Sequence, residues 1–409
     1  MRDSNLEPPT GRATWPIVRL DDVAKRGSGH TPSQSHPEYW NGGIFWVSLA
    51  DSSRLDRHTI FETTKNISDL GIHHSSAVLH PAGTVIVCRD AAIGKSAILG
   101  RAMAVSQHFI SWQCASNGPL HNEYLYYWLQ SMKPVFEKVA NGSTIKTIGL
   151  GFFENLKVAL PPATLQRSIA DVLRTWDAAI DKTERLVAAQ AVAYEHLSHA
   201  LLTGRRRVGR QRSNWPSVAL TDVTREATAR NKAGQLDADA VMGVNKLHGM
   251  IPMKDHVRSA DLSRYKVVRP GAFAYNPMRL NIGSLAQNDH GQDVLVSPDY
   301  VAFETRPDLL LPAYFDHLRR TPTWSRFVKR AGSGGVRIRI YYEDLADFIL
   351  DLPPLDEQQR IVEVLDTGLR EIAIIERQRD ALAKQKRGLM QKLLTGEWTV
   401  KMPESEAAE

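Results

Sequence analysis

The apolar residues of the chain are most regular in two long stretches, residues 160–204 and 352–396. In both stretches the positions of one helical face step alternately by four and three residues, which is the a/d pattern of a coiled coil. The pattern predicts two long helices, each with a narrow apolar seam. The apolar seam residues are Ile169, Leu173, Trp176, Ile180, Leu197, Leu201, Ile361, Leu365, Ile372, Leu389 and Leu393.

The two stretches are copies of each other. They align without a gap at a shift of 192 residues, and each opens with Leu-Pro-Pro and closes with Leu-Leu-Thr-Gly. Proline fits the first turn of a helix and glycine fits its left-handed cap. These sequences therefore predict where each helix begins and ends.

The length of the helices favours pairing between them. Each would run on the order of 60 Å at 1.5 Å per residue. Since two matched seams in one chain can cover each other, we expect the helices to pair antiparallel. The alternative is an amphipathic helix lying on its own domain, but globular helices of about 8–20 residues are shorter than this.

A second repeat shows that the whole chain is a tandem. The Trp-Pro segment 15–23 recurs at 215–223, so a globular block precedes each helix. We expect a disordered lead (1–14), a first block (15–157), a first helix (158–204), a basic linker (205–214), a second block (215–350), a second helix (351–398) and an acidic tail (399–409).

Short apolar runs between turn residues predict a mixed α/β (α+β) fold for each block. Residues 43–47 and 84–87 are typical of strands, and residues 123–129 are typical of a helix. The second block repeats this order with a strand at 271–275 and a helix at 314–318. In both blocks a basic, glycine-bearing segment follows that helix.

Composition narrows the class of protein. A chain of 409 residues is long enough for two or three domains, and a formal charge of +6 is compatible with nucleic acid. Cys88 and Cys114 are too few for a disulfide framework, which favours a reducing compartment. No apolar run reaches the length of a membrane span and no signal peptide is recognisable, so we expect a cytoplasmic protein.

Sequence motifs give little support for catalysis. Asn276-Pro277 begins like the catalytic motif of amino-methyltransferases, but Met278 and Arg279 stand where a proline and an aromatic are needed. We interpret this stretch as a turn between strands that presents Arg279. The phosphate-loop pattern requires a glycine five residues before Gly94, where the chain has an arginine. No histidine or cysteine spacing suits a metal cage, so the sequence indicates a binding protein.

In its tandem organisation the chain resembles the specificity subunit of type I restriction-modification enzymes, over about residues 15–398. The helix openings and closings carry the resemblance, together with family-like segments in both blocks. One departure is Ala163-Thr164-Leu165-Gln166 in the first helix, where the second keeps the acidic Asp356-Glu357-Gln358. The segments are Leu160-Pro161-Pro162, Gln166, Leu201-Leu202-Thr203-Gly204, Leu352-Pro353-Pro354, 357–361, Leu393-Leu394-Thr395-Gly396, 39–48, 92–95 and 275–283.

The resemblance implies a non-catalytic DNA-binding subunit. Each block would be a target-recognition domain for one half of a bipartite DNA sequence, and the helices would be a spacer and a docking surface. The implied partners are double-stranded DNA, two methyltransferase subunits and restriction/translocase subunits, with no membrane. S-adenosylmethionine would bind to the methyltransferase partner, and this chain would hold no cofactor and no metal.

Base recognition requires side chains such as arginine, lysine, asparagine or glutamine at base edges. Our candidates are Arg89, Lys95 and Lys146 in the first block, and Arg279, Arg337 and Arg339 in the second. For each of them a solvated surface charge is the alternative. Two other function classes stay open: a coiled-coil scaffold that joins proteins, and a stand-alone methyltransferase, which the missing catalytic motif disfavours.

Overall fold

The computed structural model describes residues 6–7, 15–142, 146–209, 214–232, 234–246, 248–253, 261–331 and 339–400. Arg337, most of the lead, part of the linker and most of the tail lie outside these residues. The chain forms two compact units, Met1–Glu184 with Gln378–Glu409, and Arg185–Arg377. We call them unit 1 and unit 2. No helix of the described residues is long and apolar enough to cross a membrane.

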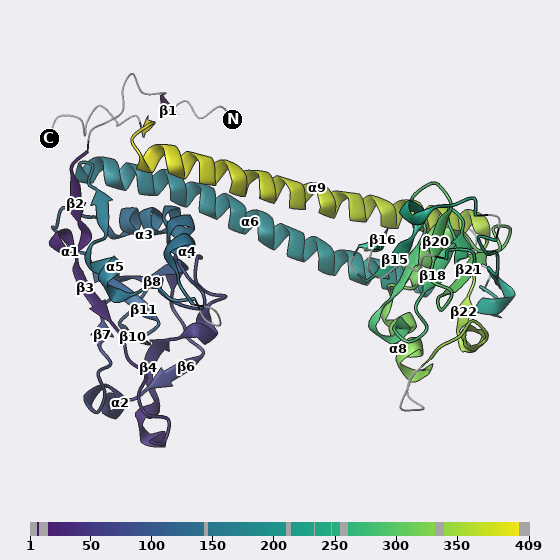
Figure 1. Cartoon of the computed structure of the whole chain (residues 1–409), viewed down its shortest axis with the longest axis horizontal. Helices are drawn as coiled ribbons and strands as arrows, with labels where there is room; N and C mark the ends of the chain where they lie inside the picture. The colour runs from purple at the N-terminus through teal and green to yellow at the C-terminus, as the bar shows by residue number, and fades with distance from the viewer. Residues whose placement is uncertain are drawn as a thin grey trace. The chain divides into compact units, whose positions relative to one another are not determined.

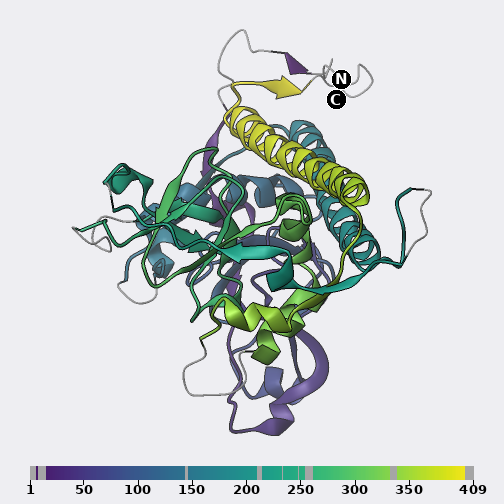
Figure 2. The same cartoon turned by 90° about the vertical axis from the view of Figure 1, so that its right-hand side faces the viewer.

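Two helices of 40 residues, α6 (Ala163–Leu202) and α9 (Leu355–Leu394), lie side by side in both views (Figures 1 and 2). In unit 1 the Lys386 ammonium group donates to the Asp177 carboxylate. In unit 2 the Tyr194 ring lies 3.1 Å from the position that a Cβ on Gly368 would take. Residue numbers therefore rise along α6 while they fall along α9, which confirms the predicted antiparallel pairing.

The predicted seam residues differ in burial along the helices. Near the helix ends the seam residues belong to apolar clusters that include residues of the globular blocks. Buried seam residues are Ile169, Leu173, Leu201, Ile361, Leu365, Leu389 and Leu393. Partly buried seam residues are Trp176, Ile180, Leu197 and Ile372.

Polar contacts tie each block to the helices. In unit 1 the Tyr127 hydroxyl donates to the second oxygen of Asp177 at 2.8 Å. In unit 2 the His317 ring bonds the Tyr194 hydroxyl through Nδ1 at 3.1 Å and the Asp366 carboxylate through Nε2 at 2.9 Å. Each block is thus held to the helices by named side chains as well as by apolar packing.

Unit 1 is built on a sheet with the strand order β3-β11-β8-β9-β5 and a second sheet with the order β6-β4-β10-β7. The strands β8 and β9 are buried throughout, which explains why their sequences do not alternate between apolar and charged residues. Strand bounds are β1 Leu6–Glu7, β2 Ile17–Arg19, β3 Lys25–Ser28, β4 Trp40–Val47, β5 Thr59–Ile60, β6 Lys65–Ile67, β7 Leu79–His80, β8 Val85–Cys88, β9 Ser96–Leu99, β10 Met103–Val105, β11 Phe109–Gln113, β12 Lys157–Ala159 and β23 Thr399–Val400. Helix bounds are α1 Leu20–Val23, α2 Asp69–His73, α3 Asn122–Ser131, α4 Lys133–Val139 and α5 Leu150–Glu154.

Unit 2 is built on a sheet with the order β14-β21-β18-β19, to which β3-β11-β8-β9 of unit 1 corresponds strand by strand. Both sheets are antiparallel over these strands. Strand bounds are β13 Ser217–Ala219, β14 Thr224–Glu226, β15 Met242–Asn245, β16 Gly249–Pro252, β17 Lys266–Val268, β18 Phe273–Tyr275, β19 Leu285–Gln287, β20 Val294–Val296, β21 Val301–Thr305 and β22 Ile349–Asp351. Helix bounds are α7 Pro312–Leu318 and α8 Pro322–Ala331. The mixed α/β fold predicted for both blocks is confirmed.

A buried glutamine anchors each block to the first turn of its helix. In unit 1 the Gln166 amide donates to the carbonyls of Pro119 and Pro161, both at 2.8 Å, and accepts from the His121 amide at 2.8 Å. Gln358 of unit 2 repeats this set of bonds with the Leu309 and Pro353 carbonyls and the Leu311 amide. Neither glutamine side chain is reached by solvent.

Candidate nucleic-acid interface

Two chain segments meet at the same place in both units. One is the connection between the paired strands, residues 89–95 between β8 and β9 in unit 1 and residues 276–284 between β18 and β19 in unit 2. The other is the described part of the segment that follows α4 or α8, which is residues 140–142 and 146–149 in unit 1 and residues 339–341 in unit 2. The amide of Ile148 donates to the Arg89 carbonyl at 2.8 Å, and the amide of Ile340 donates to the Pro277 carbonyl at 3.1 Å. We call these paired segments the recognition edge of each unit.

The recognition edge of unit 1 contains the three basic residues predicted there. Arg89 Nε donates to the Ile148 carbonyl at 3.1 Å, and Lys95 Nζ donates to the Ser52 carbonyl at 2.8 Å. Lys146 is exposed, and its carbonyl accepts from the Ala91 amide at 3.3 Å. Two of the three basic side chains are therefore already bonded to backbone oxygens of the chain.

An imidazole at this edge was missed from the sequence. His108 Nδ1 lies 2.8 Å from both Asp90 carboxylate oxygens, at the end of β8. Asp90 also forms an isolated bridge with Thr147 of the neighbouring segment. His108 is separated from Asp90 in the sequence, so only the strand pairing brings the two together.

The recognition edge of unit 2 is more open. The stretch from Asn276 to Arg279 is a turn between β18 and β19, as the sequence predicts, and Arg279 is exposed. The Asn276 carboxamide oxygen accepts from the Met278 amide at 2.9 Å, and Gly283 closes the turn with φ +92°. Only glycine takes this left-handed conformation readily.

Two apolar side chains stand beside Arg279 on this turn. Met278 is 47% exposed and Ile282 is 59% exposed. Sequence reasoning missed both, although their apolar character within a polar turn was visible. Arg339 is also exposed, and its Nη1 donates to the Tyr341 hydroxyl at 3.2 Å. Arg337 lies outside the described residues.

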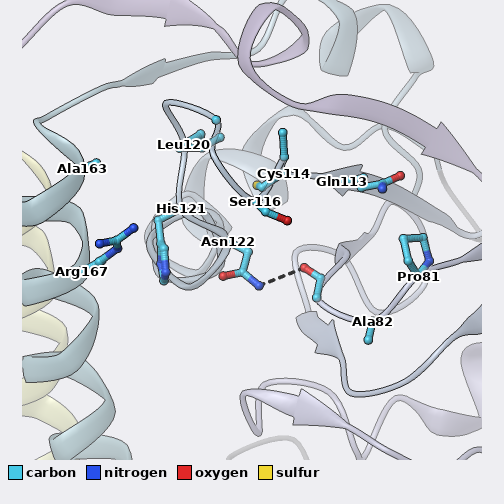
Figure 3. Close-up of a pocket in the computed structure, with 13 residues that line it drawn as sticks. Pro81, Ala82, Gln113, Cys114, Ser116, Leu120, His121, Asn122, Ala163 and Arg167 are labelled. Atoms are coloured by element: carbon cyan, nitrogen blue, oxygen red, sulfur yellow. Dashed lines mark hydrogen bonds between the residues drawn. The ribbon is translucent and has the colours of Figure 1, made fainter.

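A pocket of about 370 Å³ lies elsewhere in unit 1, where α6 begins beside α3 (Figure 3). Asn122 donates across one side of it to the Gly83 carbonyl at 3.1 Å. Burial lowers the pKa of His121 and raises the pKa of the Cys114 thiol to about 12, so the pocket holds a protonated thiol. A protonated thiol is a poor nucleophile. Within the described parts of the chain, His, Cys, Asp and Glu form no cluster of three that could hold a metal ion.

Comparison with known families gives one clear match. The family model described as the type I restriction modification DNA specificity domain matches residues 13–189 and 279–384. These ranges include both long helices in part, the unit 1 recognition edge, and Arg279 and Arg339 of unit 2.

Individual relatives agree with this match. The chain is 25% identical to the type I restriction enzyme MjaIX specificity subunit of Methanocaldococcus jannaschii over 42% of this chain and 40% of that protein. It is 22% identical to the MjaVIII specificity subunit of the same organism over 95% of this chain and 93% of that one. The crystal structure of a type I restriction-modification S subunit from M. genitalium superposes with a TM-score of 0.55 at 11% identity, covering 97% of this chain and 99% of the other. At that identity the superposition shows a common fold.

Proposed function

Because the chain belongs to the family of type I restriction modification DNA specificity domains, we propose that it is the DNA-recognition subunit of a type I restriction-modification system. Each unit contacts its own short stretch of double-stranded DNA through its recognition edge. The bases between the two stretches are not contacted. The chain itself carries out no catalysis.

The duplicated recognition edge is the observation that carries this proposal. The same pair of segments, joined by an equivalent backbone hydrogen bond, presents basic residues in both units. Basic side chains suit DNA in two ways, since they neutralise phosphates and donate to guanine N7 and O6. Arg279, the exposed arginine between the exposed Met278 and Ile282, has the chemistry for a guanine contact next to apolar contacts with thymine methyl groups.

The long helices would have two roles in this function. A rigid antiparallel pair sets the separation of the two DNA stretches. Its exposed faces give room for two methyltransferase subunits, which would bring S-adenosylmethionine and methylate adenine. Restriction/translocase subunits would join the assembly for cleavage.

A block exchange tests the proposal directly. Residues 215–350 are replaced by the matching block of a relative, and the chain is combined with its methyltransferase partner. Mapping of methylated adenines should show one half of the target changed, with the other half and the gap unchanged. The unmodified chain with its partner is the reference, and the chain without the partner should methylate nothing. Changes in both halves, or methylation by the chain alone, would contradict the proposal.

A further inference from the structure

A basic groove borders the recognition edge of unit 2. It has a volume of about 390 Å³ and lies between helix α8 and the β18–β19 connection. Its described lining residues include four cations and no carboxylate. The cations are Lys246, Arg319, Arg320 and Lys329.

The charges of the groove are only partly compensated. The Asp316 carboxylate accepts from both Arg319 and Arg320, so one negative charge serves two guanidinium groups. Arg320 is half exposed. Lys246 and Lys329 are exposed as well, and the stem of Lys246 packs 3.3 Å from the position that a Cβ on Gly283 would take.

The floor of the groove is apolar. Leu280, Leu285, Trp324 and Val328 line it and are buried. An apolar floor lowers the local dielectric constant, so an anion bound there is attracted more strongly than one held by lysines on an open surface. Among the residues that the structure describes, the groove therefore combines an excess of positive charge with an apolar floor that strengthens its attraction for an anion.

Resting on the function proposed above, we propose that this groove grips backbone phosphates of the DNA strand whose bases lie against Arg279. Phosphate contacts fix the register of a protein on DNA, while base contacts specify the sequence. The groove is well placed for this task because Leu280, Asn281, Ile282 and Gly283 of the recognition edge form one of its walls. Lys246 and Lys329 are exposed and supply charges that a phosphate can reach.

The corresponding place in unit 1 is filled. A Cβ on Gly94 would lie 3.0 Å from Lys133 Cγ and 3.3 Å from its Cα, so helix α4 packs directly on the β8–β9 connection. The Lys133 ammonium group lies 3.4 Å from Asp56. We therefore assign this phosphate-binding groove to unit 2 and expect no equivalent groove beside the unit 1 recognition edge.

Salt dependence of DNA binding tests the assignment. The full chain is titrated against a fluorescent duplex of random sequence at several NaCl concentrations, with affinity read from anisotropy. The test variant carries Lys246→Ala and Lys329→Ala. Each lost phosphate contact should flatten the plot of log affinity against log salt by about 0.9, and the double variant by about 1.8. Its affinity at low salt should fall at least tenfold.

Lys133→Ala is the matched control, because it removes a lysine of the same kind from the equivalent place in unit 1. It should leave the salt slope within error of wild type, and Lys246→Arg with Lys329→Arg should restore most of the wild-type slope. Thermal unfolding verifies that all variants are folded. A double alanine variant with the wild-type slope would overturn the groove while leaving the proposed function intact. A wild-type chain that binds no duplex at any salt concentration would overturn the proposed function as well.

Discussion

The two recognition edges are built on the same backbone but differ in what they expose. In unit 1 the side chains of Arg89 and Lys95 donate to carbonyls of their own chain. In unit 2 the turn leaves Met278, Arg279 and Ile282 exposed. The two recognition edges therefore expose different hydrogen-bond donors and different apolar groups. This difference suits them to different base sequences.

The frame of each unit, by which we mean the paired strands and the buried glutamine that join a block to the start of its helix, is instead the same in both units. Strand β2 pairs with β12 as β13 pairs with β22, and Leu160 and Leu352 each donate to the proline carbonyl of the matching Trp-Pro segment at 2.9 Å. The strand pairing and the glutamine bonds that hold a block to the start of its helix are therefore duplicated bond for bond. The surface that would meet DNA is free to vary.

The largest effect should come from breaking the frame. Gln166→Leu and Gln358→Leu each leave two carbonyls and one amide of a buried turn without their partner. At about 1–3 kcal/mol for each of the three groups left without a partner, either change should cost roughly 3–9 kcal/mol. Chemical denaturation measures the loss, and Gln359→Leu, at an exposed neighbouring position, is the control. Because the hydrogen bonds of the two glutamines match, the two losses in free energy of unfolding should agree. A large loss from only one substitution would show that matching hydrogen bonds do not contribute equally to stability.

A smaller effect should come from the recognition edges. Arg279→Ala should cost about 1–3 kcal/mol of discrimination at one base position if its guanidinium meets a guanine. Arg89→Ala should relax sequence preference less, because its Nε is already bonded to the Ile148 carbonyl. Binding of the assembled complex to targets altered one base pair at a time measures both. Equal loss of discrimination would mean that Arg89 leaves its carbonyl partner when DNA binds.

The smallest loss of stability should come from a hydrogen-bonded contact at the start of α9 that has no counterpart at the start of α6. Glu357 accepts two bonds from Arg207 at 2.7 Å and one from Trp215 at 3.0 Å, whereas the equivalent residue of unit 1 is Leu165. The hydrogen bonds from Arg207 hold the pKa of Glu357 below its ordinary 4.5. A carboxyl group with a lowered folded-state pKa stabilises fully above its unfolded pKa, and this stabilisation disappears as pH falls through the folded value.

Glu357→Gln should therefore cost about 1 kcal/mol at neutral pH and nothing in strong acid. Denaturant unfolding at pH 7 and at successively lower pH compares the variant with wild type. Glu363→Gln, an exposed change on the same helix, serves as the control. A difference from wild type that stays constant down to strong acid would mean that this contact acts through packing and not through charge.

The sequence predicted the long helices well because their signals are local. Leu-Pro-Pro and Thr-Gly mark the ends, and the structure places α6 at Ala163–Leu202 and α9 at Leu355–Leu394. The basic residues of the recognition edges were selected from charge and glycine content near turns. Their bonding partners were not predictable, since Lys95 and Ser52 are brought together by the fold across 43 residues.

The groove of unit 2 could not be predicted from the sequence either, because segments that are distant in the chain form it. Lys246 and Lys329 belong to different elements, and nothing in their neighbouring residues indicates that they line one cavity. His108 beside Asp90 is another contact made by strand pairing alone. Periodic patterns therefore predict the two long helices, whereas contacts between distant segments determine the chemistry of the surface.

The contacts of Asp177 also bear on how the chain avoids misfolding. An apolar seam repeats every seven residues, so a slipped pairing one heptad away would bury nearly as much apolar surface. A slip in one direction would bring Leu393 in place of Lys386 opposite Asp177 and leave the carboxylate without its cation, whereas a slip in the other direction would bring Arg379 there. The polar pair would thus disfavour one of the two neighbouring registers during folding.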